Sequence, residues 1–186
     1  MKKILVITGS RSEFGLIKPL VKKLNDSNHF NAQLIVTGSH LAYKHGNTYK
    51  EIEKENIKIF KKIKINEFSS NKNENLTITS IAKGLNEFYK FYLKEKPDLV
   101  IIPCDRYEML GPAFAAFFLN IPIAHLFGGE TSYGSQDETI RHVLTKISTY
   151  HFVTHKSHKK RVIQMGENKK NVFLVGNMTI DNILST

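Results

Sequence analysis

The sequence has 186 residues and a formal net charge of +10, from 27 Lys plus Arg against 17 Asp plus Glu. Hydrophobic residues make up 41% and charged residues 24%, which is typical of a folded domain and excludes a disordered or fibrous chain. No apolar run approaches the roughly 20 residues of a membrane-spanning helix, and the run at residues 4–7 ends too soon for an export signal. The single Cys104 excludes an intrachain disulfide, so we expect a cytoplasmic protein.

The positive charge comes almost entirely from lysine. Only four basic residues are arginine, namely Arg11, Arg106, Arg141 and Arg161. Arginine suits bidentate recognition of phosphates and bases, whereas lysine is a more diffuse, solubilising charge. No nucleic-acid-binding motif accompanies the lysines. We therefore interpret the charge as a solvated basic face, with a polyanion-binding face as the alternative, and expect neither a nucleic-acid nor a membrane partner.

Apolar runs and helical patterns alternate along the chain. A continuous apolar run at residues 4–7 predicts a strand buried on both faces, followed by a helix over 14–24 and a strand over 32–37. The patterns that follow predict, in chain order, a helix over 49–55, a strand over 57–63, a helix over 76–92, a strand over 99–102, a helix to about 119, a strand over 121–126, a helix over 137–148, a strand over 150–154, a helix over 158–165 and a strand over 172–175. This alternation predicts an α/β fold with a Rossmann-like, doubly wound parallel sheet.

In such sheets the chemistry lies at the carboxyl ends of the strands. The first predicted strand ends in Gly-Ser-Arg-Ser-Glu at residues 9–13, the fourth in Asp-Arg-Tyr-Glu at 105–108, and the fifth in the segment 125–130. Three of the four arginines fall in or beside such segments. A glycine-rich turn before a helix suits phosphate. The turn at 9–13 is neither GxGxxG nor a Walker A loop, so NAD and P-loop chemistry are not indicated.

Three acidic residues at these strand ends are the candidate acid–base groups. Asp105, Glu130 and Asp137 are expected to converge on one crevice, where carboxylates act as general acid or base. Capping of a helix is the alternative for Asp105 and for Asp137, whereas Glu130 lies in a Gly-Gly-Glu turn without an obvious capping role. The i, i+4 spacing also predicts that Asp137 pairs with Arg141, and Glu138 with His142.

Other reactive side chains give weaker signals. His151, His155 and His158 suggest a metal site, but no cysteine or carboxylate completes a ligand set, so we expect no metal. Cys104 is better explained as a small buried residue at a strand end than as a nucleophile. No Gly-x-Ser-x-Gly motif indicates a serine hydrolase.

Taken together, five segments resemble a known family. They are Gly-Ser-Arg-Ser-Glu-Phe-Gly at 9–15 with Lys18 and Pro19, Cys-Asp-Arg-Tyr-Glu-Met at 104–109, His-Leu-Phe-Gly-Gly-Glu at 125–130, Asp-Glu-Thr-Ile-Arg-His at 137–142, and Gly176-Asn177 with Asp181. In this order they resemble the N-terminal half of UDP-N-acetylglucosamine 2-epimerases. The first and third segments look like the hydrolysing branch, which serves sialic-acid-type sugar synthesis.

The resemblance implies the N-terminal half of a two-domain GT-B-like fold, with a nucleotide sugar bound between the domains. Residues 1–176 are then the N-terminal Rossmann-like domain carrying the catalytic carboxylates, residues 177–186 begin the interdomain hinge, and the C-terminal domain is absent. The implied reaction eliminates UDP across C1–C2 of the sugar and then adds water, giving N-acetylmannosamine or a related 2-epimeric sugar. We expect the chain to be inactive alone. The alternative is a non-catalytic remnant, or a subunit that needs a separately encoded second domain.

By position, Asp105, Glu130 and Asp137 match the family's catalytic carboxylates, with the role of each left open. Substrate-binding residues are expected at Gly9, Arg11, Glu13, Lys18, Arg106, Glu108, His125, Gly129, Arg141 and His142. The resemblance implies no metal, nicotinamide or other cofactor. It implies UDP-N-acetylglucosamine or a relative as substrate, without deciding the sugar or the base, and we expect a homo-oligomer. Cys104 departs from the family, which often has glycine there.

Overall fold

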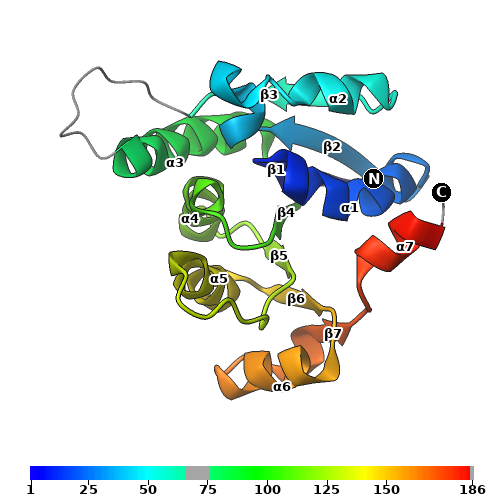
Figure 1. The fold of residues 1–186 in the computed structure, drawn as a ribbon, viewed down its shortest axis with the longest axis vertical. Coiled ribbons are helices and arrows are strands. Elements are labelled where there is room, and N and C mark those ends of the chain that lie inside the picture. The colour runs from blue at the N-terminus through cyan, green and yellow to red at the C-terminus, as the bar shows by residue number, and fades with distance from the viewer. Residues whose placement is uncertain (66–75, 185–186) are drawn as a thin grey trace.

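The protein folds around one parallel sheet of seven strands (Figure 1). A computed structural model describes residues 1–65 and 76–184. The strands are β1 (Lys2–Thr8), β2 (Phe30–Val36), β3 (Ile59–Lys62), β4 (Leu99–Pro103), β5 (Ile123–Leu126), β6 (Tyr150–Val153) and β7 (Val172–Leu174). Their order across the sheet is β3-β2-β1-β4-β5-β6-β7, with all neighbours parallel. The predicted doubly wound, Rossmann-like sheet is confirmed.

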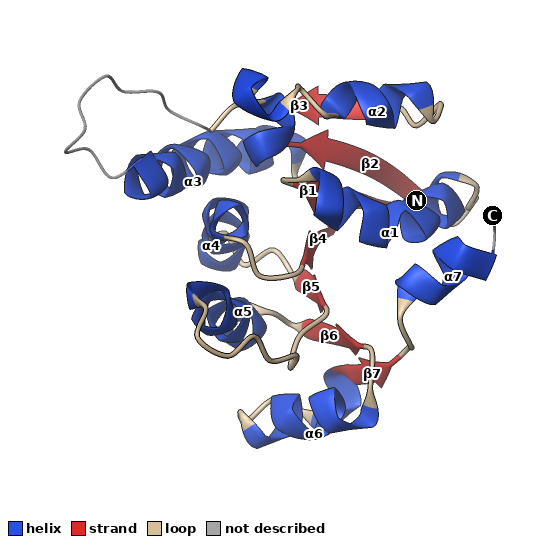
Figure 2. Cartoon of the chain, viewed as in Figure 1, coloured by secondary structure: helices blue, strands red, loops and turns tan. Residues whose placement is uncertain are grey.

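Helices cover both faces of this sheet (Figure 2). They are α1 (Arg11–Asn25), α2 (Tyr49–Lys54), α3 (Leu76–Glu95), α4 (Leu110–Phe118), α5 (Gln136–Ile147), α6 (Lys156–Gln164) and α7 (Met178–Leu184). In the view of Figure 2, α3, α4 and α5 lie on one side of the sheet, and α1 and α7 on the other. Among the described residues, no helix is both long and apolar enough to cross a membrane.

Each face of the sheet has its own hydrophobic core because side chains alternate along a strand. On β1, Leu5 and Ile7 point to the core under α3, α4 and α5, where they join Phe88 and Leu144. Ile4 and Val6 point to the opposite core, under α1 and α2. A strand with both faces covered needs a continuous apolar run, which is why residues 4–7 identified β1.

The strand order reverses between β1 and β4, and this reversal determines where a ligand-binding crevice is expected. β1 continues into a crossover that leads to β2 on one side, whereas β4 leads to β5 on the other. In open α/β sheets, the two diverging crossovers leave a crevice at the carboxyl ends of the strands. The segments after β1, β4 and β5 therefore border one region.

One strand is shorter than its sequence pattern predicts, and one helix was not predicted. The strand expected over 57–63 is confined to Ile59–Lys62, and its pairing with β2 is irregular between Leu34 and Ile35. Residues 178–184, which the resemblance assigned to the start of a hinge, form α7. This helix packs beside α1, and Met178 joins the core on that face of the sheet.

Candidate active site

A pocket of about 210 Å³ opens at the carboxyl ends of β4 and β5. Two of the three predicted carboxylates, Asp105 and Glu130, line it together with Arg141. The other lining residues are Leu16, Cys104, Phe127 and Asn177. The pocket thus gathers residues from the ends of two neighbouring strands, from α5, from α1 and from the segment before α7.

Arg141 connects α5 to the end of β4. Its Nη2 donates to an Asp105 carboxylate oxygen and, at 3.0 Å, to Ser132 Oγ. The predicted pairing of Asp137 with Arg141 is therefore wrong, because the long guanidinium turns across to the neighbouring strand end. Nε and Nη1 of Arg141 are buried and have no hydrogen-bond partner among the described residues. The guanidinium therefore places a largely buried positive charge in the wall of the pocket.

Glu130 belongs to a hydrogen-bonded group on the other wall of the pocket. Thr154 Oγ1 donates to Glu130 Oε1 at 2.8 Å and lies 2.9 Å from His158 Nδ1. His158 Nδ1 is itself 3.9 Å from the same carboxylate oxygen. Burial lowers the pKa of His158, against the opposing effect of Glu130. Thr154 and Ser132 were missed from sequence, although Thr154 directly follows β6 and so lies at a strand's carboxyl end.

Asp137 does not line this pocket. It lies in the first turn of α5, where its N–H donates to the N-cap Ser135 Oγ at 3.1 Å. The capping role considered for Asp137 thus belongs to Ser135. The neighbouring Glu138 accepts from Ser132 N–H at 2.8 Å and lies 3.7 Å from His142 Nε2, as its spacing predicted. Glu138 and His142 therefore brace the loop that carries Ser132.

The turn after β1 is built around a buried carboxyl group. Glu13 is 2% exposed, and its Oε2 accepts from Gly9 N–H at 2.8 Å. Burial raises the pKa of Glu13 to about 7. Arg11 and Lys18 instead lie on the outer side of α1, where they pair with Glu51 at 2.9 Å and Glu55 at 2.8 Å. Neither basic side chain lines the pocket.

Arg106 and Glu108 form a bidentate pair beside that turn. Arg106 Nε and Nη2 each lie 3.1 Å from a Glu108 carboxylate oxygen, and the Glu108 side chain is only 1% exposed. A Cβ on Gly9 would come within 3.4 Å of Glu108 Cβ. The pair therefore supports the turn after β1 from the end of β4.

His125 is fully buried beneath the pocket. Its Nε2 lies 2.8 Å from the carbonyl oxygen of Cys104, and its Nδ1 lies 3.2 Å from Thr145 Oγ1. Burial lowers the pKa of His125 to about 4, so the imidazole is neutral near pH 7. Because Cys104 precedes Asp105, we interpret His125 as a positioning residue for that carboxylate. It does not reach the ligand space.

Backbone conformation also shapes this edge. Cys104 has φ +57°, a left-handed conformation that favours glycine. Glycine is often found at this position in the family that the sequence resembles. Burial raises the pKa of the Cys104 thiol, which argues against a nucleophilic thiolate. Gly129, between Phe127 and Glu130, has φ +78°, and its carbonyl oxygen accepts from Arg161 Nη1. Gly129 thus contributes backbone geometry next to Glu130.

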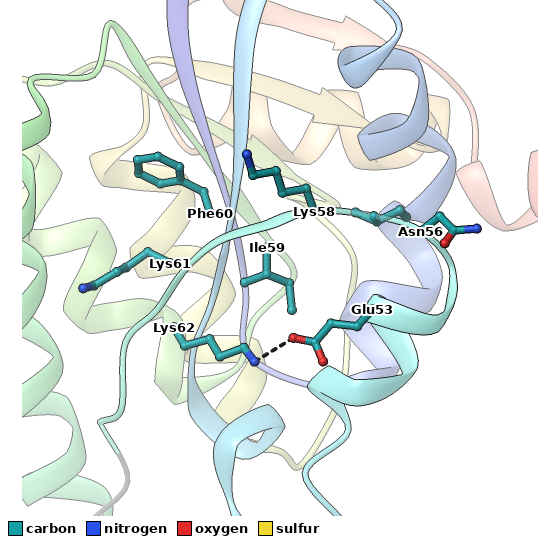
Figure 3. A pocket seen from close by; sticks show the side chains of 8 residues that line it. Glu53, Asn56, Lys58, Ile59, Phe60, Lys61 and Lys62 are labelled. Atoms are coloured by element: carbon teal, nitrogen blue, oxygen red, sulfur yellow. Dashed lines mark hydrogen bonds and ion pairs between the residues drawn. The ribbon is translucent and has the colours of Figure 1, made fainter.

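A larger pocket lies elsewhere, at the β3 edge of the sheet (Figure 3). It has a volume of about 680 Å³ and is lined by residues 53 and 56–62. Lys58, Lys61 and Lys62 surround it, and Lys62 pairs with Glu53 at 2.7 Å. Lysines are a common means of protecting an unpaired edge strand from association with other chains. We therefore assign the chemistry to the smaller pocket, which holds the carboxylates.

Within residues 1–65 and 76–184, no group of three or more His, Cys, Asp or Glu side chains is arranged to hold a metal ion. The buried His151, one of the histidines that suggested such a site, instead lies 3.2 Å from Glu167 Oε2.

A sequence profile of the family described as UDP-N-acetylglucosamine 2-epimerase matches residues 22–186. The chain belongs to this family. It is 40% identical over 177 residues to the GDP/UDP-N,N'-diacetylbacillosamine 2-epimerase (hydrolyzing) of Campylobacter jejuni, covering 95% of this chain and 45% of the relative. It is also 40% identical over 185 residues to polysialic acid biosynthesis protein P7 of Escherichia coli, covering 100% and 47%. The family resemblance drawn from the motifs is confirmed.

Solved structures give the same result for the fold. The UDP-N-acetylglucosamine 2-epimerase of Methanocaldococcus jannaschii, determined with UDP-GlcNAc and UDP, superposes with a TM-score of 0.85 at 26% identity. The match covers 98% of this chain and 49% of that one. This epimerase-family chain therefore spans about half the length of the relatives it matches.

Proposed function

We propose that this chain is the N-terminal, acid–base half of a hydrolysing UDP-N-acetylglucosamine 2-epimerase. The observation that carries the proposal is the meeting of Asp105, Glu130 and Arg141 in one pocket at the strand ends. Family membership and the names of the relatives support the reaction class. The structure determined with UDP-GlcNAc and UDP supports a nucleotide-sugar substrate.

The chemistry of the pocket suits an elimination followed by a hydration. A carboxylate removes the proton on C2 of the sugar while the bond from C1 to the UDP oxygen breaks, which leaves a glycal and UDP. Water then adds its hydroxyl to C1, and a protonated carboxyl group returns a proton to the opposite face of C2. The net reaction consumes one water and releases UDP and the 2-epimeric free sugar.

The residues on the two walls of the pocket have different roles in the proposed reaction. Asp105 and Glu130 come from different strands, so one carboxyl group can take the C2 proton while the other delivers one. Arg141 fixes the orientation of Asp105 and places positive charge where an anionic leaving group develops charge. Thr154 and His158 connect Glu130 to a second titratable group, which offers a route for resetting its proton. Asp137 is kept as a third, more distant acidic residue to be tested.

The names of the relatives reduce the number of candidate sugar substrates. Two of them are named hydrolysing N,N'-diacetylbacillosamine 2-epimerases, from Campylobacter jejuni and Legionella pneumophila. We therefore propose a UDP-linked sugar with an acetamido group at C2, either UDP-N-acetylglucosamine or UDP-N,N'-diacetylbacillosamine. Because the chain spans about half of each relative, we propose that turnover requires a second domain.

The decisive experiment supplies that second domain. The chain is fused to the remaining half of the Campylobacter jejuni relative, and release of UDP and free sugar is followed by NMR in D₂O with both substrates. We expect turnover with deuterium at C2 of the product, and little or no turnover by the chain alone. A folded fusion that releases no UDP from either substrate would refute the proposal.

Substitutions in that fusion assign the roles. Asp105→Asn and Glu130→Gln should each lower kcat by about 10²-fold or more, because a positioned acid or base contributes that much. Glu53→Gln, whose side chain pairs with Lys62 at the β3 edge of the sheet, is the matched control and should leave kcat unchanged. Asp137→Asn decides whether the third acid takes part: a loss as large as that of Asp105→Asn places it in the reaction, and full activity removes it.

A further inference from the structure

The Glu130 carboxylate and the His158 imidazole share one bridging hydroxyl group. Thr154 Oγ1 lies 2.8 Å from Glu130 Oε1 and 2.9 Å from His158 Nδ1. His158 Nδ1 is 3.9 Å from the same carboxylate oxygen, which is too far for a direct hydrogen bond. Thr154 therefore provides the hydrogen-bonded connection between the two titratable side chains.

The number of available protons determines which nitrogen of His158 is protonated. The Thr154 hydroxyl has one proton, and an ionised Glu130 can only accept, so this proton points to Glu130. Thr154 Oγ1 must then accept its other hydrogen bond from His158, which requires a proton on Nδ1. Burial lowers the pKa of His158, so the ring is mostly neutral near pH 7 and carries this one proton. Nε2 is then unprotonated.

Backbone packing fixes the distance between Glu130 and His158. A Cβ on Gly129 would lie 2.6 Å from the carbonyl oxygen of His158, so the turn before Glu130 is in close contact with the first turn of α6. Arg161, one turn further along α6, donates from Nη1 to the carbonyl oxygen of Gly129. The two contacts hold the three hydrogen-bonded groups in the geometry that proton transfer requires.

His158 also reaches solvent. Its side chain is 23% exposed, and the exposed His155 lies beside it with ring centroids 5.7 Å apart. The charged groups that act on His158 are Glu130, which favours a protonated ring, and Arg161, Arg141 and protonated His155, which disfavour it together with burial. The ring can therefore pass a proton on without retaining it as a stable imidazolium.

We propose that His158 supplies protons from solvent to Glu130, with Thr154 as the bridge. In this step, the proton on His158 Nδ1 moves to Thr154 Oγ1, and the original hydroxyl proton of Thr154 moves to Glu130 Oε1. One proton from solvent binds His158 Nε2. The carboxylate becomes a carboxyl group, Thr154 keeps one proton, and the imidazole stays neutral in its other tautomer. The ring regains the starting tautomer by exchange with water.

This inference rests on the proposed function and adds a direction to it. A carboxyl group that is reloaded from solvent is the one that returns a proton to C2 of the sugar, which is the part of Glu130. Asp105, held by the positive charge of Arg141, is then the carboxylate that removes a proton.

The first test is the tautomer of His158 in the chain itself. Long-range ¹H–¹⁵N NMR distinguishes the two neutral tautomers by the shifts of the ring nitrogens, and His158→Gln identifies the signals. We expect a proton on Nδ1 near pH 8, and a shift toward Nε2 in Thr154→Val, which removes the bridging oxygen but keeps the side-chain shape. A wild-type ring protonated on Nε2 overturns the proposal. Because this measurement needs no turnover, it tests the proposal even if the fused enzyme is inactive and the proposed function fails.

The second test is kinetic and uses the fusion with the Campylobacter jejuni half. His158→Gln should lower kcat by about 10-fold, less than Glu130→Gln does, because water still protonates the carboxylate slowly. Added imidazole should restore kcat in His158→Gln but not in Glu130→Gln, whereas a loss of structure would not respond to imidazole. Thr154→Ser keeps the hydroxyl and should stay active, while Thr154→Val should lose as much as His158→Gln.

His29→Gln is the matched control, because His29 is an exposed histidine between α1 and β2 and its replacement should leave kcat unchanged. Far-UV circular dichroism identifies the folded variants, and Thr154→Val replaces His158→Gln if the latter does not fold. An active fusion in which His158→Gln keeps the wild-type kcat, or in which imidazole restores nothing, overturns the proposal and leaves the proposed reaction standing.

Discussion

At the scale of single residues, backbone geometry constrains the pocket as much as side-chain chemistry does. Gly129 combines a left-handed φ of +78° with a close approach, because a Cβ there would lie 2.6 Å from the carbonyl oxygen of His158. We expect Gly129→Ala to lower the free energy of unfolding by about 3 kcal/mol, from strain and from displacement of α6. Gly134→Ala is the control, since Gly134 has the same φ in open space and should lose only about 1 kcal/mol. Urea unfolding of both variants measures the difference, and equal losses would contradict the close-approach argument.

Glu13 is the second residue with a measurable consequence. Its pKa rises from 4.5 to about 7 on folding because the carboxyl group is buried. The contribution of Glu13 to the free energy of unfolding is therefore fully present below pH 4.5. It is lost as the pH rises through 7, because the native state must then bury a carboxylate. Glu13→Gln removes this dependence. We expect the variant to match the wild type near pH 4 and to exceed it by on the order of 2 to 3 kcal/mol at pH 8, measured by urea unfolding. A constant difference across this range would show that burial does not raise the pKa.

At the scale of elements, the crossing of α3 and α4 depends on glycine. A Cβ on Gly111 would meet both the carbonyl carbon of Gly84 and the amide nitrogen of Leu85 at 2.8 Å. Backbone cannot give way as a side chain can, so we expect Gly111→Ala to cost about 2 kcal/mol or more of unfolding free energy. Gly15→Ala should have the opposite effect on stability, because Gly15 lies inside α1 and a Cβ added there would meet no neighbouring atom. That variant should gain about 0.5 to 1 kcal/mol. Thermal unfolding of the two variants tests the contrast.

The sequence could predict those elements whose formation depends on residues close together in the chain. Continuous apolar runs identified β1 and β4. The sequence also predicted that Asp105 and Glu130 meet, because they lie in the loops that follow two neighbouring parallel strands. Helix α7 was missed because Met178 packs against residues distant in sequence. The partner of Arg141 was wrong for a similar reason, since helical spacing cannot show where a long side chain turns.

At the scale of the whole molecule, two titrations with opposite signs act on stability. Burial lowers the pKa of both His40 and His125 from 6.5 to about 4. The contribution of these histidines to the free energy of unfolding is present above pH 6.5. It is lost as the pH falls toward 4, because unfolding then exposes imidazoles that bind protons. Over much of the same range, Glu13 stabilises the native state as the pH falls. The wild-type profile should therefore be shallow between pH 7 and pH 5.

The Glu13→Gln variant separates the two effects. Without the opposing carboxyl group, the histidines should lower the free energy of unfolding by on the order of 3 to 4 kcal/mol between pH 7 and pH 5. Urea titrations at several pH values provide the measurement. If the variant is as insensitive to pH as the wild type over this interval, the histidines do not remain neutral in the folded protein.

The position of β1 has a consequence for how the chain is made. β1 leaves the ribosome before β2 and β4, and it pairs with β2 on one side and with β4 on the other, where Ile4 lies opposite Leu99. Until β4 has been synthesised, one edge of this buried strand has no partner, and open edges of apolar strands promote association between chains. The central pairing also joins residues far apart in sequence, which slows folding. The nascent chain must therefore keep one edge of this buried strand unpaired while the two crossovers between β2 and β4 are translated.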